Sequence, residues 1–177
     1  FNTDSNTNYV VQIDTIGLPL IVTCPNSFIR NIVLTNADSI KLNQNFGLEC
    51  KGVDVGVLSI QSRFRAGRTN TVSLVAGDII KEFYKANCSN NIGGIVVINF
   101  SGPVNYVGPA LGALTPSTIS GNTLSYSLSD FSTLPSCAFN FVLATDTHAV
   151  IGSSICISVT VSTASDINLS NNSLSQC

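Results

Sequence analysis

The stretch Ser153–Cys177, SSICISVTVSTASDINLSNNSLSQC, decides the fold of this chain. Its first half alternates apolar residues, from Ile155 to Val161, with small polar ones, which is the period-two pattern of a strand that buries one face. A turn rich in Asp and Asn follows, and such side chains hydrogen-bond their own backbone in turns. A second short strand ends the stretch, so we expect two antiparallel strands that close a β-sandwich.

Similar β-prone stretches, separated by Gly, Pro and Asn, recur throughout the sequence. They are residues 9–13, 20–23, 28–34, 40–42 and 46–52, followed by 53–60, 69–75, 95–100, 123–128, 138–144, 155–161 and 172–175. The first five are short and closely spaced, which predicts a small β unit over residues 1–51. The others predict an immunoglobulin-like antiparallel β-sandwich over residues 52–177. We therefore expect an all-β fold with two domains.

Two segments depart from the strand pattern. Apolar residues recur at helical spacing over residues 76–86, and Asp78 stands where an N-cap belongs, which predicts one short inserted helix. Residues 102–112 are rich in Gly and Pro. Because proline cannot donate a hydrogen bond to a central ladder, we expect a loop or an irregular edge there.

The charge balance excludes some partners. Charged residues make up 10% of the chain, and eight basic against ten acidic side chains give a net charge of −2. This balance offers no electrostatic basis for nucleic-acid binding and disfavours anionic membranes. Hydrophobic residues make up 44% of the chain, yet no apolar run approaches the roughly 20 residues that span a bilayer. We expect neither nucleic-acid binding nor membrane insertion.

Six cysteines occur without the Cys-x-x-Cys spacing of zinc or thioredoxin-like sites, which favours disulfides and an oxidising compartment. Our interpretation pairs Cys24 with Cys50 and leaves Cys88, Cys137, Cys156 and Cys177 unassigned. The alternative is that several are buried free thiols, because cysteine is among the most buried residue types.

The first residues, Phe1–Asp4, lack the basic and then apolar order of a signal peptide, and the chain contains no Met. We expect a mature or excised part of a longer exported protein. Its expected location is extracellular or on a bacterial cell surface.

Four segments together resemble a known family: KGVDVGVLSIQSRFRAGRTNTVSL, SGNTLSYSLSDF, CAFNFVLATDTHAVIGSSICISVTV and DINLSNNS. They are similar to the CARDB-like, conserved-repeat immunoglobulin-type domains of exported surface proteins in the Bacteroidetes, over residues 52–177. Residues 9–51, ending in FGLEC, look like the C-terminal part of a prealbumin-like repeat of large bacterial adhesins. The resemblance implies type IX secretion and surface display. The additional segment AGDIIKEFYKANC departs from the family pattern.

His148 is the only histidine, and Asp146 two residues before it suggests a base with its orienting group. No Gly-x-Ser-x-Gly nucleophile motif accompanies them, so a hairpin-loop histidine is the plainer interpretation. We therefore expect no catalytic residues and a protein that is not an enzyme.

The aspartates are dispersed, and none begins a calcium loop with alternating Asp and Asn ligands. We expect no cofactor. A calcium site built from Asp166, Asn168 or their neighbours is the alternative to an ordinary turn, because these residues stabilise turns without an ion.

Arg63, Arg65 and Arg68 form the only basic cluster. In an extended segment Arg63 and Arg65 project from the same face. Arginine's planar fork suits carboxylates, so the cluster is a candidate site for holding a partner domain. The plainer interpretation is a solvated edge or turn, since isolated surface charges contribute little.

The tripeptides Asp14-Thr15-Ile16 and Asp38-Ser39-Ile40 resemble the O-glycosylation signal of exported Bacteroidetes proteins. Thr15 and Ser39 are therefore candidate glycosylation sites. In a chain rich in Ser and Thr such tripeptides also arise by chance.

These observations favour a non-catalytic structural or adhesive module of a secreted, cell-surface multidomain protein, with neighbouring domains of the same polypeptide as partners. One alternative is a module that binds carbohydrate or protein, although the chain has no Trp for a stacking platform. Another is a subunit or client of a larger surface or secretion assembly, in which a sheet edge pairs with a neighbouring chain.

Overall fold

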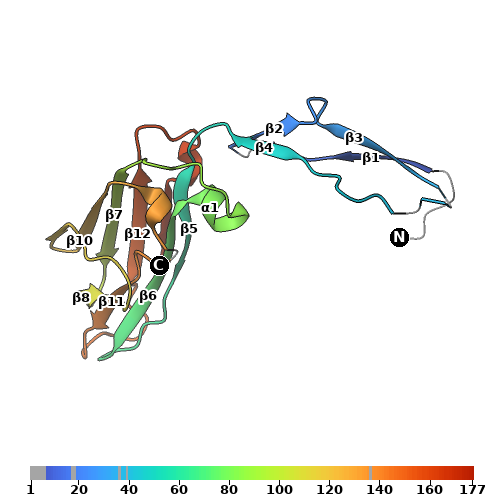
Figure 1. Cartoon of the computed structure of the whole chain (residues 1–177). Coiled ribbons are helices and arrows are strands. Elements are labelled where there is room, and N and C mark those ends of the chain that lie inside the picture. The colour runs from blue at the N-terminus through green and yellow to red at the C-terminus, as the bar shows by residue number, and fades with distance from the viewer. Residues whose placement is uncertain (1–6, 17–18, 36, 39, 136) are drawn as a thin grey trace. The chain divides into compact units, whose positions relative to one another are not determined.

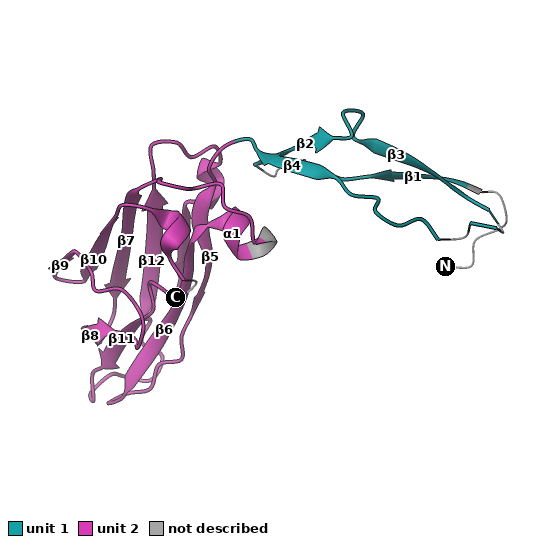
Figure 2. Cartoon of the chain, in the orientation of Figure 1, with its two compact units in different colours: residues 1–51 teal, residues 52–177 magenta. Residues whose placement is uncertain are grey.

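The computed structural model describes residues 7–16, 19–35, 37–38, 40–135 and 137–177. The chain forms two compact units, residues 1–51 and residues 52–177, which Figure 2 colours separately. Strands dominate both units (Figure 1). The α-helix of the described residues, α1 (Ile79–Tyr84), belongs to unit 2.

Unit 1 contains two separate antiparallel strand pairs. β1 (Thr7–Gln12) pairs with β3 (Ile29–Leu34), and β2 (Leu20–Cys24) pairs with β4 (Gly47–Cys50). Residues 40–42 are irregular, so the strand predicted there is wrong. Arg30 of β3 fixes the irregular segment before β4, since its Nε and Nη2 donate to the carbonyl oxygen of Asn45 at 2.9 and 2.7 Å.

Unit 1 buries few apolar side chains. Among its described residues the buried hydrophobic ones are Leu20 and Val22 of β2, which are 5% and 6% exposed. Both strand pairs leave other large apolar side chains exposed, namely Val10, Val11, Ile21, Ile29, Val33 and Leu48. A two-stranded sheet with so little burial is marginally stable by itself. Unit 1 therefore has much less apolar burial to stabilise it than unit 2.

Unit 2 is a sandwich of two antiparallel sheets (Figure 1). In spatial order, the five-stranded sheet contains β13 (Ser173–Gln176), β12 (Cys156–Ser162), β7 (Gly94–Ser101), β10 (Thr123–Leu128) and β9 (Thr118–Ser120). The four-stranded sheet contains β5 (Val55–Gln61), β6 (Thr69–Asp78), β11 (Phe141–Thr145) and β8 (Val104–Pro109). Two 3-10 turns, η1 (Phe131–Thr133) and η2 (Leu169–Asn171), lie in the connections. The predicted all-β sandwich with a small N-terminal β unit and one short helix is confirmed.

The strand neighbours match those of an immunoglobulin sandwich. The order β5-β6-β11-β8 corresponds to strands A-B-E-D, and β13-β12-β7 corresponds to G-F-C. The hairpin β9–β10 extends the second of these sheets beyond β7. In sequence this hairpin comes between β8 and β11, after the strand in the D position, so the connection differs from that of a variable domain.

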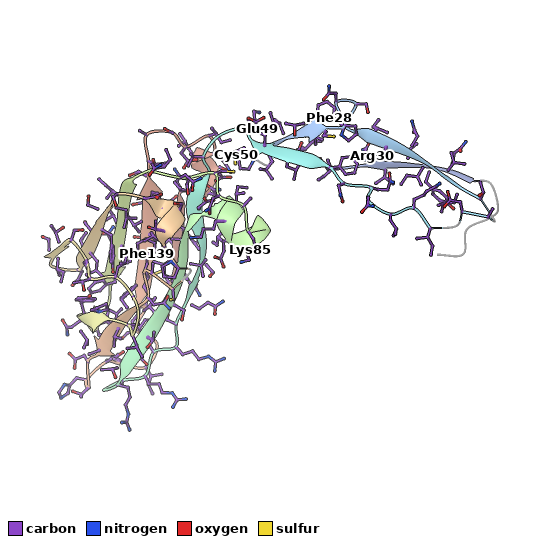
Figure 3. All side chains as sticks on the ribbon, in the orientation of Figure 1. Phe28, Arg30, Glu49, Cys50, Lys85 and Phe139 are labelled. Carbon is purple, nitrogen blue, oxygen red and sulfur yellow. A yellow bond between two sulfur atoms is a disulfide. The ribbon has the colours of Figure 1, made fainter. Side chains whose placement is uncertain are left out.

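Alternate strand residues fill the space between the sheets. In β12, Ile157, Val159 and Val161 are at most 2% exposed, as the alternation predicts. Phe139 lies inside the sandwich (Figure 3), where its ring meets that of Tyr126 edge to face with centroids 5.2 Å apart. Burying each such side chain stabilises the fold by about 1.5–3 kcal/mol.

Two strands were not predicted, and one helix is shorter than predicted. β8 lies at the edge of its sheet and ends at Pro109, which is tolerated because an edge strand pairs on one side only. β9 has three residues, too few to show a period. Helix α1 begins only at Ile79, because β6 continues to Asp78, whose side chain caps the helix by accepting from the backbone N–H of Lys81 at 2.9 Å.

Candidate functional site

The predicted basic cluster lies at one end of the sandwich, in the connection between β5 and β6. Exposed Arg63 and Arg65 alternate with half-buried Ser62 and Phe64, and Phe64 packs against the core. The alternation follows from extended backbone, which places the two arginines on the solvent side. Arg68 is also exposed, and its N–H donates to the carbonyl oxygen of Arg65 at 3.2 Å to close the turn. We call this region, residues 61–73 with the facing residues 145–155, the arginine end.

The arginine end carries an excess of positive charge. In the part of the chain that the structure describes, none of the three forms an ion pair with a carboxylate. The carboxylate of the arginine end is Asp146. The other carboxylates of unit 2 lie toward the opposite strand ends, namely Asp54, Asp78, Glu82, Asp130 and Asp166. Lys81 and Lys85 lie at that end as well. The arginine end is therefore locally cationic, although the whole chain is slightly acidic.

A polar groove of about 540 Å³ runs beside Arg63. Its lining side chains are Gln61, Ser62, Arg63, Asn70, Thr71, Ser73 and Gln176, from β5, β6 and β13. Asn70 donates from Nδ2 to the carbonyl oxygen of Arg68 at 2.9 Å and to Thr145 Oγ1 at 3.0 Å. The other six side chains make no hydrogen bond to another described residue. Their donors and acceptors are free to meet a ligand.

A second hollow at the arginine end is mainly apolar. It has a volume of about 260 Å³ and is lined by Phe64, Ala66, Pro103, Thr145, Ala149, Val150, Ile151, Gly152, Ser153 and Ile155. Val150 and Ile151, in the connection between β11 and β12, are 74% and 102% exposed. These side chains expose apolar surface beside the cationic loop.

The pair His148 and Asp146 forms a surface turn. The His148 ring is 93% exposed, and its Nδ1 lies 3.3 Å from Asp146 Oδ1. The backbone N–H of His148 donates to the same oxygen at 2.8 Å, which lowers the pKa of Asp146 below its usual value. Ala149 N–H also donates to the carbonyl oxygen of Asp146 at 3.2 Å. This is the hairpin-loop arrangement that the sequence favours.

The candidate calcium residues form a turn as well. Asp166 Oδ1 accepts from the Asn168 N–H at 3.0 Å, and Asn168 Oδ1 accepts from the Ser170 hydroxyl at 2.6 Å. Three buried oxygens in this connection have no hydrogen-bond partner: Asp166 Oδ2, Asn171 Oδ1 and Asn172 Oδ1. The described residues contain no group of three or more His, Cys, Asp or Glu side chains placed to hold a metal ion. The calcium site stays an untested alternative to an ordinary turn.

The cysteines differ from the predicted pairing. Cys156 and Cys177 form a disulfide, and Cys50 and Cys88 are also disulfide-bonded, whereas Cys24 and Cys137 are exposed free thiols. The structure therefore does not contain the expected Cys24–Cys50 bond. Cys24 lies opposite Gly47 and Cys50 lies opposite Leu20, so the register separates the two cysteines by about 13 Å along the strands. A disulfide needs Cα atoms within about 7 Å.

One of the two glycosylation candidates is described. Thr15 is half-buried and follows Asp14, whose Oδ1 accepts from the Ile16 N–H at 2.9 Å in a local turn. Ser39 lies outside the described residues. Glycosylation of either residue stays a prediction.

The polar groove was not predicted as a unit. The charge of Arg63 marks it as a candidate, but Gln61, Asn70 and Gln176 come from three different strands. The available signal was the run of outward polar residues in β6, where Thr71 and Ser73 alternate with buried Val72 and Leu74. That signal marks a solvent face and does not reveal which strand lies beside it.

Comparison with known proteins gives no match: no family model, curated protein or solved structure is significantly similar to this chain. Within the residues that are described, no helix is both long and apolar enough to cross a membrane.

Proposed function

We propose that the chain is a non-catalytic structural and adhesive module of a multidomain protein displayed on a bacterial surface. Its disulfides indicate an extracytoplasmic protein, because such bonds persist in oxidising compartments. Surface display through type IX secretion is part of this proposal, and it follows only from the resemblance of the four quoted segments to CARDB-like domains. A surface low in charge and rich in Ser, Thr and Asn is compatible with this location.

The observation that carries the proposal is a clasp between the segment that enters β5 and the connection that leads into β13. Val53, just before β5, forms a parallel bridge with Asp166, and its carbonyl oxygen accepts from the Ile167 N–H at 2.9 Å. Asn171 Nδ2 donates to Asp54 Oδ1 at 2.7 Å. These bonds tie the chain entering the sandwich to the connection that leads into β13.

The Cys156–Cys177 disulfide protects the last strand of unit 2 from tension. β12 and β13 are antiparallel neighbours, and the disulfide joins the start of β12 to the residue after β13. Tension at the end of β13 therefore passes into β12 and the body of the sheet, so β13 cannot be peeled away first. The clasp at Val53 and Asp54 adds hydrogen bonds that hold the start of β5 in the folded sandwich. A domain that resists tension in this way suits a spacer or presenter in a surface protein.

Pulling the full chain by its two ends in a single-molecule experiment tests this function. We expect unit 2 to unfold in one discrete event, at a lower force in the Asn171→Ala variant. The double variant Cys156→Ser, Cys177→Ser should release about 7 nm more chain, because 21 further positions become extensible. Gradual extension of unit 2 without a discrete event would contradict the proposal.

Unit 1 supports a second role, pairing with a neighbouring chain. Its strand pairs expose apolar side chains such as Val10 and Val33, and a two-stranded sheet offers backbone edges to an incoming strand. Light scattering coupled to size-exclusion chromatography tests this role over a range of concentrations. We expect mass to rise with concentration, and less so in the Val10→Lys, Val33→Lys variant. A monomer at every concentration speaks against self-pairing.

A further inference from the structure

We propose that the polar groove at the arginine end binds an acidic oligosaccharide, with Arg63 receiving the carboxylate of a uronic acid residue. The inference rests on the adhesive part of the proposed function and names the ligand that this part would use. It concerns the groove lined by Gln61, Arg63, Asn70, Thr71 and Gln176 together with Ser62 and Ser73.

The groove has the size and the chemistry that a sugar chain needs. Its volume of about 540 Å³ lies within the range of small-ligand sites, but its lining is amide, hydroxyl and guanidinium rather than apolar. Amide side chains such as Gln61 and Gln176 both donate and accept, as sugar hydroxyls do. Six of the seven lining side chains have no hydrogen-bond partner in the described protein, so binding does not require them to give up internal bonds.

Charge selects an acidic sugar over a neutral one. Arg63 has no carboxylate partner among the described residues, and Arg65 and Arg68 in the same connection have none either. A guanidinium binds a carboxylate through two parallel hydrogen bonds, which are stronger than bonds between neutral groups. Asp146 is the acidic side chain of this end, and its oxygen already accepts hydrogen bonds from His148.

The absence of a stacking platform agrees with this choice. The groove lining contains no aromatic residue, so a neutral sugar would have to bind through hydroxyl bonds that merely replace those with water. An ionised carboxylate adds the charge-assisted contact that the neutral sugar lacks. The competing occupant is an anionic bilayer, suggested by exposed Val150 and Ile151. We favour the sugar because every residue that lines the larger groove is a polar one.

Isothermal titration of the full chain with three probes tests the inference. The probes are oligogalacturonate of defined length, a neutral galacto-oligosaccharide of equal length, and vesicles of phosphatidylcholine with phosphatidylglycerol. We expect binding of the oligogalacturonate at low salt, weakened at higher salt because the contact is ionic and exposed. Neither the neutral sugar nor the vesicles should bind comparably.

Three variants separate the role of Arg63 from general charge. Arg63→Gln should weaken oligogalacturonate binding about tenfold, the loss expected for one hydrogen-bonded charge contact. Arg63→Lys should restore part of the affinity, because the charge returns without the planar fork. Lys85→Gln removes the same charge from the other end of unit 2 and should leave the affinity unchanged.

Each other outcome overturns the inference. Equal binding of the neutral sugar removes the role of charge, binding to vesicles alone assigns the end to a membrane, and no binding to any probe leaves the groove without this ligand. Equal losses in Arg63→Gln and Lys85→Gln indicate general charge attraction. The titration does not depend on mechanical resistance, so its failure alongside a discrete unfolding event in the pulling experiment contradicts the sugar site alone.

Discussion

Asn171 donates a hydrogen bond from Nδ2 to Oδ1 of Asp54 at 2.7 Å, joining residues that are 117 positions apart. Asp54 is only 3% exposed, so its carboxylate depends on partners within the protein. Asn171 lies against Gly56 of β5, where a Cβ atom would stand 2.8 Å from Asn171 Oδ1. The glycine therefore makes room for the amide that satisfies the buried carboxylate.

Asn171→Ala should lower the free energy of unfolding of unit 2 by about 1.5–3 kcal/mol, because it leaves a buried charged acceptor without its donor. Urea unfolding of the full chain measures the change. Ser170→Ala, in the same connection, removes an exposed hydroxyl that donates to Asn168 and should change stability by no more than about 0.5 kcal/mol. Equal effects of the two variants would show that the Asp54 contact contributes nothing special.

Phe141→Ala tests the core directly. Phe141 is fully buried in β11, and removing its ring leaves a cavity between the sheets, so we expect a loss of about 3–5 kcal/mol. Val107→Ala provides the control, because Val107 lies in edge strand β8 and is 57% exposed. Thermal unfolding followed by circular dichroism compares the two. A shift of no more than a degree or so for Phe141→Ala would refute its place in the core.

The strands of the sandwich core were predictable because apolar residues, which are buried, alternate with polar ones along each strand. Ile157, Val159 and Val161 show it within seven residues, and a one-residue shift would expose all three. β8 was missed because its outward positions include Val107, and its Gly and Pro residues are typical of a loop. Local sequence patterns predict a strand where one face is buried and the other is exposed to solvent. They do not predict edge strands, where the difference between the two faces is small.

Contacts between distant segments were not predictable. The expected Cys24–Cys50 bond fails on register, which depends on how β2 and β4 align rather than on either strand alone. The groove could not be predicted for a related reason, since Gln176 lines it only because β13 lies near β5 and β6. Net charge also concealed the arginine end, because an average over the chain does not record that its arginines and carboxylates are kept apart.

Gly94→Ala should destabilise unit 2 by about 1–3 kcal/mol, the range for overpacking a filled site. At this position a Cβ atom would lie 2.2 Å from the carbonyl oxygen of Ser162 and 2.7 Å from the Phe131 ring. Gly108→Ala is the matched control, because a Cβ atom there meets nothing within 4 Å. We expect its effect to stay within about 1 kcal/mol of zero, in either direction. Urea unfolding separates the two, and similar losses for both would show that the close approach at Gly94 relaxes without cost.

Tyr126→Phe removes a buried hydroxyl that, like the hydroxyl of Tyr106, has no hydrogen-bond partner among the described residues. Because the native state gains nothing from this group, the variant should be as stable as the parent chain at pH 7, or more stable. Burial first, and then the charge of Tyr106, raises the pKa of Tyr126 well above its ordinary value.

The same residue gives unit 2 an alkaline sensitivity. Above a pH of about 10 the unfolded chain loses the Tyr126 proton, while the folded chain keeps it. The contribution of Tyr126 to stability is therefore fully present below that pH. It is lost as the pH rises from the pKa of the unfolded chain toward the higher pKa of the folded chain. Tyr126→Phe should therefore lose less stability than the parent chain between pH 9 and pH 11, both pH values being about one unit from the ordinary tyrosine pKa. Urea unfolding across this range decides the matter, and parallel losses in the two proteins would place the alkaline sensitivity elsewhere.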